Sequence, residues 1–106
     1  MHMAYKLSWF DIRAYLKEQF PQNESRVVED KYQPESFGCG YIVYRINQKF
    51  ISLNFDVREE QIFISESTGD SFDFRTSILL GTFCLWEYSD RVIALDNVGQ
   101  TLNRFV

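Results

Sequence analysis

The chain has 106 residues, which suits one domain spanning residues 1–106, and 45% of them are hydrophobic, enough to build a core. Its net charge is −4 and 25% of its residues are charged, which is ordinary for a folded protein and argues against disorder. No apolar run approaches the roughly 18 residues that a membrane span needs, and no secretory signal pattern is visible. We therefore expect a cytoplasmic protein without a membrane anchor.

The clearest element is a helix predicted over residues 9–20. Ser8 and Asp11 have the spacing of a capping box, in which a hydroxyl and a carboxylate close the start of a helix. Pro21 ends the helix because proline lacks the N–H that would continue it. One face carries apolar side chains that we expect to pack on a sheet, namely Trp9, Ile12, Leu16 and Phe20.

Two strands are predicted next, over residues 26–32 and 41–46. The run Val-Val-Glu-Asp at residues 27–30 breaks the alternation of the first strand and leaves its register open. Gly-Cys-Gly at residues 38–40 indicates a β-bulge or a close approach of the helix to the sheet. A phosphate-binding loop would need a further glycine and a lysine, which this stretch lacks.

The centre of the predicted sheet is a hairpin over residues 50–66. From Ile51 to Val57, apolar and polar side chains alternate without a break, as in a strand with one dry and one wet face. Residues 58–61 form a short polar connection, and a second strand begins at Ile62. Two such strands joined by about four polar residues form an antiparallel hairpin.

The remaining chain is read as strands followed by a helix. Residues 67–70 form a turn, and Phe72 to Arg75 alternates as a short strand. The apolar stretch of residues 77–88 allows a strand or a helix; we favour a strand over Thr82–Tyr88 with an irregular lead-in at residues 78–81. A last strand is predicted over residues 91–95. Asp96 is expected to cap a short C-terminal helix whose apolar face is Val98, Leu102 and Phe105.

Together these elements predict an α+β fold. We expect an antiparallel sheet of five or six strands, with the N-terminal helix packed on one face and a short C-terminal helix closing the chain.

Cysteine and histidine usage gives no sign of a metal site. Cys39 and Cys84 lie 45 residues apart and lack metal-ligand spacing. We read them as free thiols in strands, with a disulfide as the alternative. The only histidine, His2, lies in Met1-His2-Met3, which resembles a cloning remnant.

The carboxylates form no recognisable catalytic pair. Glu59 and Glu60 are neighbours in a turn, so their side chains point apart. Asp70 and Asp73 do not fit the calcium loop, which needs a glutamate further along. We therefore expect a protein that is not an enzyme, with no catalytic residues, no metal and no cofactor.

Negative charge gathers in the second half of the chain. Residues 51–106 hold nine acidic and four basic side chains, and residues 56–73 hold six acids against Arg58. This balance disfavours direct nucleic-acid binding and favours a basic protein partner. Tyrosine and tryptophan are favoured at interfaces, so the predicted partner-binding residues combine acids and aromatics: Glu59, Glu60, Glu66, Asp70, Asp73, Trp86 and Tyr88.

A small, acidic, cytoplasmic α+β chain that is rich in aromatics and lacks catalytic motifs resembles bacterial immunity proteins. These are the antitoxins of contact-dependent inhibition and related polymorphic toxin systems. The resemblance is one of general character over the whole chain. It implies a heterodimer with a cognate toxin domain, often a basic nuclease, whose active site or an adjacent surface is covered.

Two other functions remain open. One is a mobile-element protein that inhibits a host defence enzyme, with the acidic surface mimicking nucleic acid. The other is a structural module that forms a homodimer through an unpaired edge strand. The antitoxin and inhibitor functions allow at most a weak homodimer, whereas the structural module requires stable self-association.

Overall fold

The computed structural model describes residues 6–105 and has the predicted α+β fold, with five strands. Two α-helices flank the strands in the chain, and three short 3-10 helices lie in the connections. The helices and strands are α1 Trp9–Gln19, β1 Val27–Gln33, β2 Cys39–Ile46, β3 Lys49–Asp56, β4 Gln61–Ser67, β5 Ile78–Cys84 and α2 Arg91–Asn103. The 3-10 helices are η1 Pro21–Arg26, η2 Pro34–Ser36 and η3 Leu85–Glu87.

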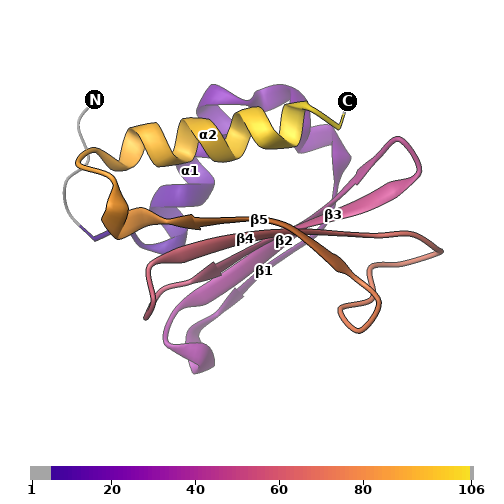
Figure 1. The fold of residues 1–106 in the computed structure, drawn as a ribbon, viewed down its shortest axis with the longest axis horizontal. Coiled ribbons are helices and arrows are strands. Elements are labelled where there is room, and N and C mark those ends of the chain that lie inside the picture. The colour runs from indigo at the N-terminus through magenta and orange to yellow at the C-terminus, as the bar shows by residue number, and fades with distance from the viewer. Residues whose placement is uncertain (1–5, 106) are drawn as a thin grey trace.

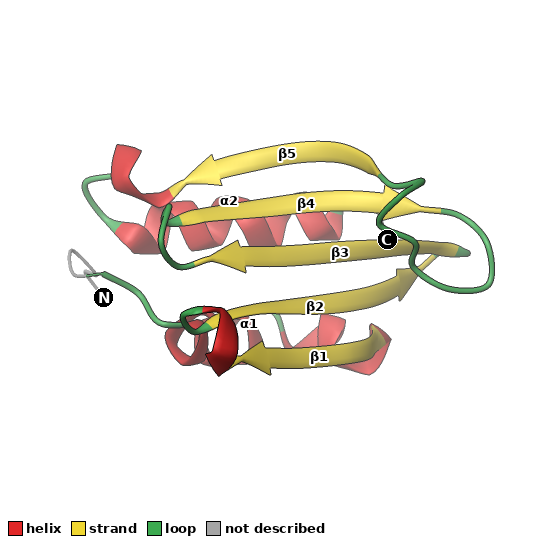
Figure 2. Cartoon of the chain, turned by 90° about the horizontal axis from the view of Figure 1, so that it is seen from below, coloured by secondary structure: helices red, strands yellow, loops and turns green. Residues whose placement is uncertain are grey.

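The strands form one antiparallel sheet in chain order, β1-β2-β3-β4-β5. Both α-helices cover the same face of this sheet, and no helix formed by residues 6–105 covers the other face (Figure 1). Seen from the uncovered side, α1 lies behind β1 and β2, and α2 runs behind β4 (Figure 2). The sheet therefore has a helix-covered face and an open face.

The predicted central hairpin is confirmed as β3 and β4, which pair from Phe50↔Ser67 to Asp56↔Gln61. Ile51, Leu53 and Phe55 of β3 are buried in the core beneath the helices, as the alternation predicts. Its polar face differs from the prediction, because Ser52 is buried as well. The β4–β5 loop curls back towards the open face and covers part of it (Figure 1).

Helix α1 begins as its sequence predicts. The Ser8 hydroxyl accepts a hydrogen bond from the Asp11 N–H at 3.2 Å, and the Asp11 carboxylate accepts one from the Ser8 N–H at 2.9 Å. The helix ends before Pro21, which starts η1. The whole predicted apolar stripe is buried: Trp9, Ile12, Leu16 and Phe20.

The pairing of β1 explains why apolar and polar residues do not alternate regularly along its sequence. The register of β1 on β2 shifts between Val27 and Glu29, so a β-bulge interrupts the alternation there. Further along, Gly40 marks the predicted close approach of helix to sheet, since the ring of Trp9 lies against it.

Three predictions for the second half are wrong. Phe72 to Arg75 is a turn and not a strand, because the Thr76 N–H bonds to the Asp73 carbonyl and the Arg75 N–H to the Asp73 carboxylate. Residues 78–81 belong to β5 itself and do not precede it, although Leu80 forms a bulge in its pairing with β4. β5 ends at Cys84, earlier than predicted, and its continuation folds into η3.

The C-terminal helix also starts earlier than predicted. Residues 91–95 are the first turns of α2 and not a strand, and Asp90 caps the helix by accepting a hydrogen bond from the Val92 N–H at 2.9 Å. Asp96 lies inside the helix and accepts a hydrogen bond from the Tyr15 hydroxyl. The spacing of the buried residues distinguishes a helix from a strand only over the whole of α2. These residues are Ala94, Leu95, Val98, Gly99 and Leu102.

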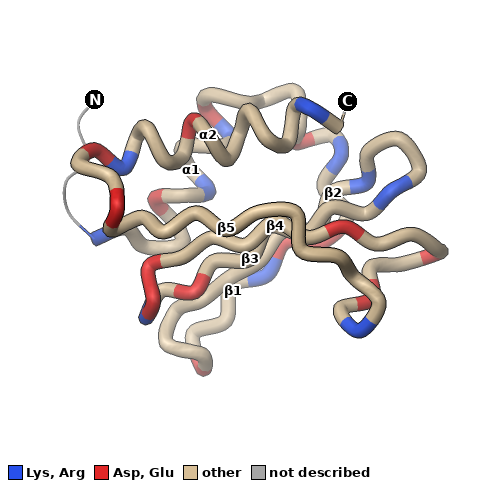
Figure 3. The backbone as a smooth tube through the Cα atoms, viewed as in Figure 1, with Lys and Arg blue, Asp and Glu red and all other residues tan. Residues whose placement is uncertain are grey.

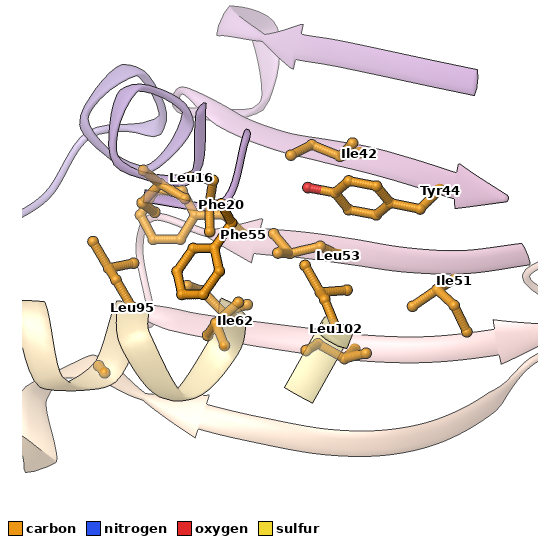
Figure 4. Packing of buried hydrophobic residues seen from close by; sticks show 14 of the residues in the cluster. Leu16, Phe20, Ile42, Tyr44, Ile51, Leu53, Phe55, Ile62, Leu95 and Leu102 are labelled. Carbon is orange, nitrogen blue, oxygen red and sulfur yellow. The ribbon is translucent and has the colours of Figure 1, made fainter. Parts of the chain in front are cut away.

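The core lies between the helices and the sheet (Figure 4). Side chains from both α-helices interlock with the helix-facing side chains of β2, β3 and β4. One charged side chain, Arg13, is buried at the margin of this core, where only 8% of it is exposed. Its guanidinium donates to Glu24 of η1 at 2.8 Å and to Asp30 of β1 at 2.9 Å, which ties α1 to both elements.

Candidate protein-binding surface

The sheet brings three connections to one of its ends. Antiparallel pairing joins Gln33 to Cys39, Asp56 to Gln61, and Gln61 to Cys84. The β1–β2, β3–β4 and β5–α2 connections therefore adjoin at this end, and the β4–β5 loop lies at the other (Figure 2). Acidic positions occur at both ends of the sheet (Figure 3).

We call the first of these ends the aromatic–acidic end, formed by residues 34–38, 56–60 and 85–91. Two large aromatic side chains are exposed there, with 68% of Phe37 and 56% of Trp86 open to solvent. Exposed aromatic side chains in a charged surrounding are typical of protein interfaces. The charged side chains of this end are six carboxylates and two arginines: Glu35, Asp56, Glu59, Glu60, Glu87, Asp90, Arg58 and Arg91.

Phe37 is held against the β3–β4 connection. The guanidinium carbon of Arg58 lies 4.4 Å from the centre of the Phe37 ring, a cation–π contact. The turn beneath Arg58 is closed by Asp56, whose carboxylate accepts hydrogen bonds from the N–H groups of Arg58 at 3.1 Å and Glu59 at 3.2 Å. The contact therefore joins two connections and places the exposed ring over an acidic turn.

The predicted acids Glu59 and Glu60 differ in their roles. Glu60 lies 3.9 Å from Arg91, and its carbonyl accepts a hydrogen bond from the Leu85 N–H at 2.8 Å. These contacts hold the β3–β4 connection against the start of α2. The Glu59 side chain is exposed and open to a partner.

The two predicted aromatic anchors also differ. Trp86 lies in η3 and is exposed, whereas Tyr88 is half-buried and packs against the core. Tyr88 therefore contributes to the fold as well as to this surface.

The other predicted acids lie away from this end. Glu66 forms an ion pair with Lys49 at 3.6 Å near the opposite end of β4. Asp70 and Asp73 lie in the β4–β5 loop, where Asp73 pairs with Arg75 at 3.4 Å. The fold thus brings Glu59, Glu60, Trp86 and Tyr88 together and separates them from Glu66, Asp70 and Asp73.

The β4–β5 loop carries a second aromatic group, on the open face. Phe74 meets Phe72 edge-on at 4.6 Å and Tyr41 of β2 at 6.2 Å between ring centres. Beside it lies a hollow of about 380 Å³. Charges of both signs line this hollow, so it does not select one sign of charge: Val28, Glu29, Val43, Arg45, Phe50, Asp70, Ser71 and Phe72.

One tyrosine on the open face has a shifted pKa. The Tyr41 hydroxyl donates a hydrogen bond to Glu29 at 2.5 Å. This bond, together with burial and the Glu29 charge, raises the pKa of Tyr41 to about 12.

Sequence reasoning missed Phe37 as a surface residue. It lies in the connection between the strands predicted over residues 26–32 and 41–46, and the sequence assigns no role to it there. The signal that could have found it is the neighbouring Gly38: both residues have positive φ, Phe37 at 61° and Gly38 at 85°, as a tight turn requires.

The described part of the chain offers no metal centre. Among residues 6–105, no group of three or more histidine, cysteine, aspartate or glutamate side chains is placed to hold a metal ion. Cys39 and Cys84 are free thiols, and His2 lies outside the described residues. Within the same range, no helix is long and apolar enough to cross a membrane.

No family model, no curated protein and no solved structure matches this chain.

Proposed function

We propose that this chain is a bacterial immunity protein, an antitoxin that neutralises a cognate toxin domain in the cytoplasm. The toxin domain is basic, as a nuclease is, and the aromatic–acidic end binds it. The observation that carries the proposal is the exposed Phe37 ring, held by Arg58 above the acidic β3–β4 turn.

The chemistry of this end suits capture of a basic partner. Exposed carboxylates such as Glu35, Glu59 and Glu87 attract a positive surface over about a Debye length and raise the association rate. Phe37 and Trp86 then lose their water on contact and slow dissociation. Binding across the catalytic cleft of a nuclease would block its substrate by occupancy alone, so the antitoxin needs no catalytic group.

The test is a pull-down from the source organism that includes the products of neighbouring genes, washed at low and then high salt. We expect one basic protein to be retained, with its binding weakened by salt. Phe37→Ala should weaken binding by at least about tenfold, as expected of an interface anchor. Glu59→Lys should chiefly slow association.

Matched variants at the other end of the sheet serve as controls. Phe74→Ala removes another exposed aromatic ring, 58% exposed against 68% for Phe37, and Asp70→Lys makes the same charge change as Glu59→Lys. Both should bind as the unmodified protein does. Loss of binding through Asp70 or Asp73 alone would move the contact to the β4–β5 loop, and no retained protein at any salt would argue against the antitoxin function.

A further inference from the structure

The two edges of the sheet differ in chemistry. At one margin, β1 carries three consecutive charged residues, Glu29, Asp30 and Lys31. Charges on an edge strand oppose pairing with another chain. At the other margin, β5 has no charged residue, and none occurs anywhere from Thr76 to Trp86.

β5 is also an exposed apolar edge. Ile78 is 62% exposed and Leu79 is 58% exposed, and Leu80 beside them is exposed too. In the described chain, β5 pairs with β4 alone. A hydrophobic edge of this kind is a site for strand addition.

The orientation of the free main-chain groups follows from one hydrogen bond. The Leu85 N–H donates to the Glu60 carbonyl at 2.8 Å, on the β4 side. Successive residues of an antiparallel ladder face the neighbouring strand and then face away from it. The main-chain groups of Thr82 and Cys84 therefore point away from β4, towards the open edge.

We propose that β5 is a dimerisation edge, which pairs with β5 of a second copy in antiparallel fashion about a twofold axis near Thr82. Two five-stranded sheets then join into one, with the helices of both copies on the same side. The pairing covers the apolar segment Ile78–Leu80 of each copy. It also brings that segment beside the end of the other β5, from which the exposed Trp86 follows.

The strand that pairs with β5 is β5 of a second copy, because this strand is complementary to itself. An uncharged strand meets its own sequence without placing like charges opposite each other. The charged β1 edge stops the same strand from adding to the far margin, so the assembly closes at two copies and does not grow into a fibre. Leu80 is the extra residue of a bulge in β5, so the main-chain hydrogen bonds of the seam lie in the segment that follows it, while Ile78–Leu80 are covered by side-chain packing.

The dimer is compatible with toxin binding. Trp86 adjoins the seam, while Phe37 and Glu59 remain outside it, on connections that β5 does not include. A dimer would therefore present two aromatic–acidic ends.

The first measurement is the mass of the protein in solution by sedimentation and light scattering over a range of concentrations. We expect the mass to rise with concentration towards twice the chain mass of 12.6 kDa, as for the weak homodimer that an antitoxin allows. Leu80→Lys places a charge on the edge and should hold the mass at that of a single chain. Val28→Lys places the same charge on the β1 edge, at a residue that is also exposed, and should leave the dimer intact.

Amide hydrogen exchange of the unmodified protein keeps the proposal testable if Leu80→Lys does not fold. In the dimer, the Thr82 and Cys84 N–H groups are hydrogen-bonded across the seam and should exchange slowly. Fast exchange at both, a single-chain mass at every concentration, or an assembly larger than two chains would each overturn the proposal. Loss of the dimer in Val28→Lys but not in Leu80→Lys would place the interface on β1 and overturn it too.

Discussion

The indole ring of Trp9 lies directly on the backbone of Gly40, where a Cβ added to Gly40 would stand 2.4 Å from Trp9 Cδ2. This contact brings the start of α1 down onto β2 and fixes the depth of the core at that point. Glycine is needed here because of space, since the ring occupies the position that any side chain would take.

Gly40→Ala should therefore destabilise the protein by about 1–3 kcal/mol through overpacking. Urea unfolding followed by circular dichroism measures the change. Gly81→Ala is the control, because a Cβ there would lie 3.7 Å from the Phe83 ring, an ordinary contact. It should leave stability unchanged or slightly raised. The cost of Gly40→Ala should shrink in a Trp9→Leu background, and an equal cost in both backgrounds would contradict the packing explanation.

Arg13 is the residue whose loss should weaken the link between α1, η1 and β1. Arg13→Ala leaves the carboxylates of Glu24 and Asp30 without their shared partner. Because both carboxylates are partly exposed, the expected destabilisation is about 2 kcal/mol, below the cost of a fully buried pair. Arg13→Lys should recover only part of it, since lysine cannot form the two-pronged bond to Glu24.

The comparison for Arg13 is Lys17→Ala on the same helix, at an exposed position. Unfolding in urea should show a shift within about 0.5 kcal/mol for this variant. If Arg13→Ala also stayed within that range, the ion pairs would not contribute to the fold.

Local sequence patterns predict the elements in which buried side chains recur at one regular spacing along the chain. The alternation from Ile51 to Val57 predicts β3 because one face of that strand meets the helices. The capping box and apolar stripe predict α1 for the same reason. The strand prediction for Arg91–Leu95 is wrong because a run of β-branched and aliphatic residues also fits a strand. The helical spacing becomes visible only when Val98 and Leu102 are included.

The β4–β5 loop was misread for a different reason. Phe72 and Phe74 alternate with polar residues as in a strand, but their rings contact each other and Tyr41 of β2. Such a contact between distant segments leaves no periodic trace in the sequence.

The sequence predicts which types of residue a partner-binding surface would contain, but not which of them lie together in space. Glu59 and Asp70 are close in sequence, yet β4 runs between them with seven residues. At about 3.3 Å per residue, that strand separates its two ends by roughly 20 Å. Conversely, Phe37, Arg58 and Trp86 come from three connections that only the strand order brings to one end.

Asp90 should carry the cap of α2 in place of the predicted Asp96. Asp90→Ala removes the acceptor for the Val92 N–H and should cost about 1 kcal/mol of stability, whereas Asp90→Asn should restore most of it. Glu87→Ala, an exposed change in the preceding η3, provides the control and should be neutral. Thermal unfolding of the three variants checks this, and equal midpoints for Asp90→Ala and Glu87→Ala would count against the cap.

The Tyr41–Glu29 hydrogen bond gives a pH dependence with a definite sign. The pKa of Tyr41 is raised from 10.0 to about 12, so the folded state holds the phenol proton more tightly than the unfolded chain does. The stabilisation from this pair should be complete below about pH 10 and should fade as the pH rises towards 12.

Glu29→Gln tests this dependence. Glutamine keeps an acceptor near the Tyr41 hydroxyl but removes the charge, so the pKa of Tyr41 should fall back towards its ordinary value. The titration is followed by NMR of ring-labelled tyrosine, with Tyr41→Phe used to assign the signal. Glu35→Gln makes the same charge change in η2 and should leave the Tyr41 titration in place. An unchanged titration in Glu29→Gln would mean that burial, and not the hydrogen bond to Glu29, holds the proton on Tyr41.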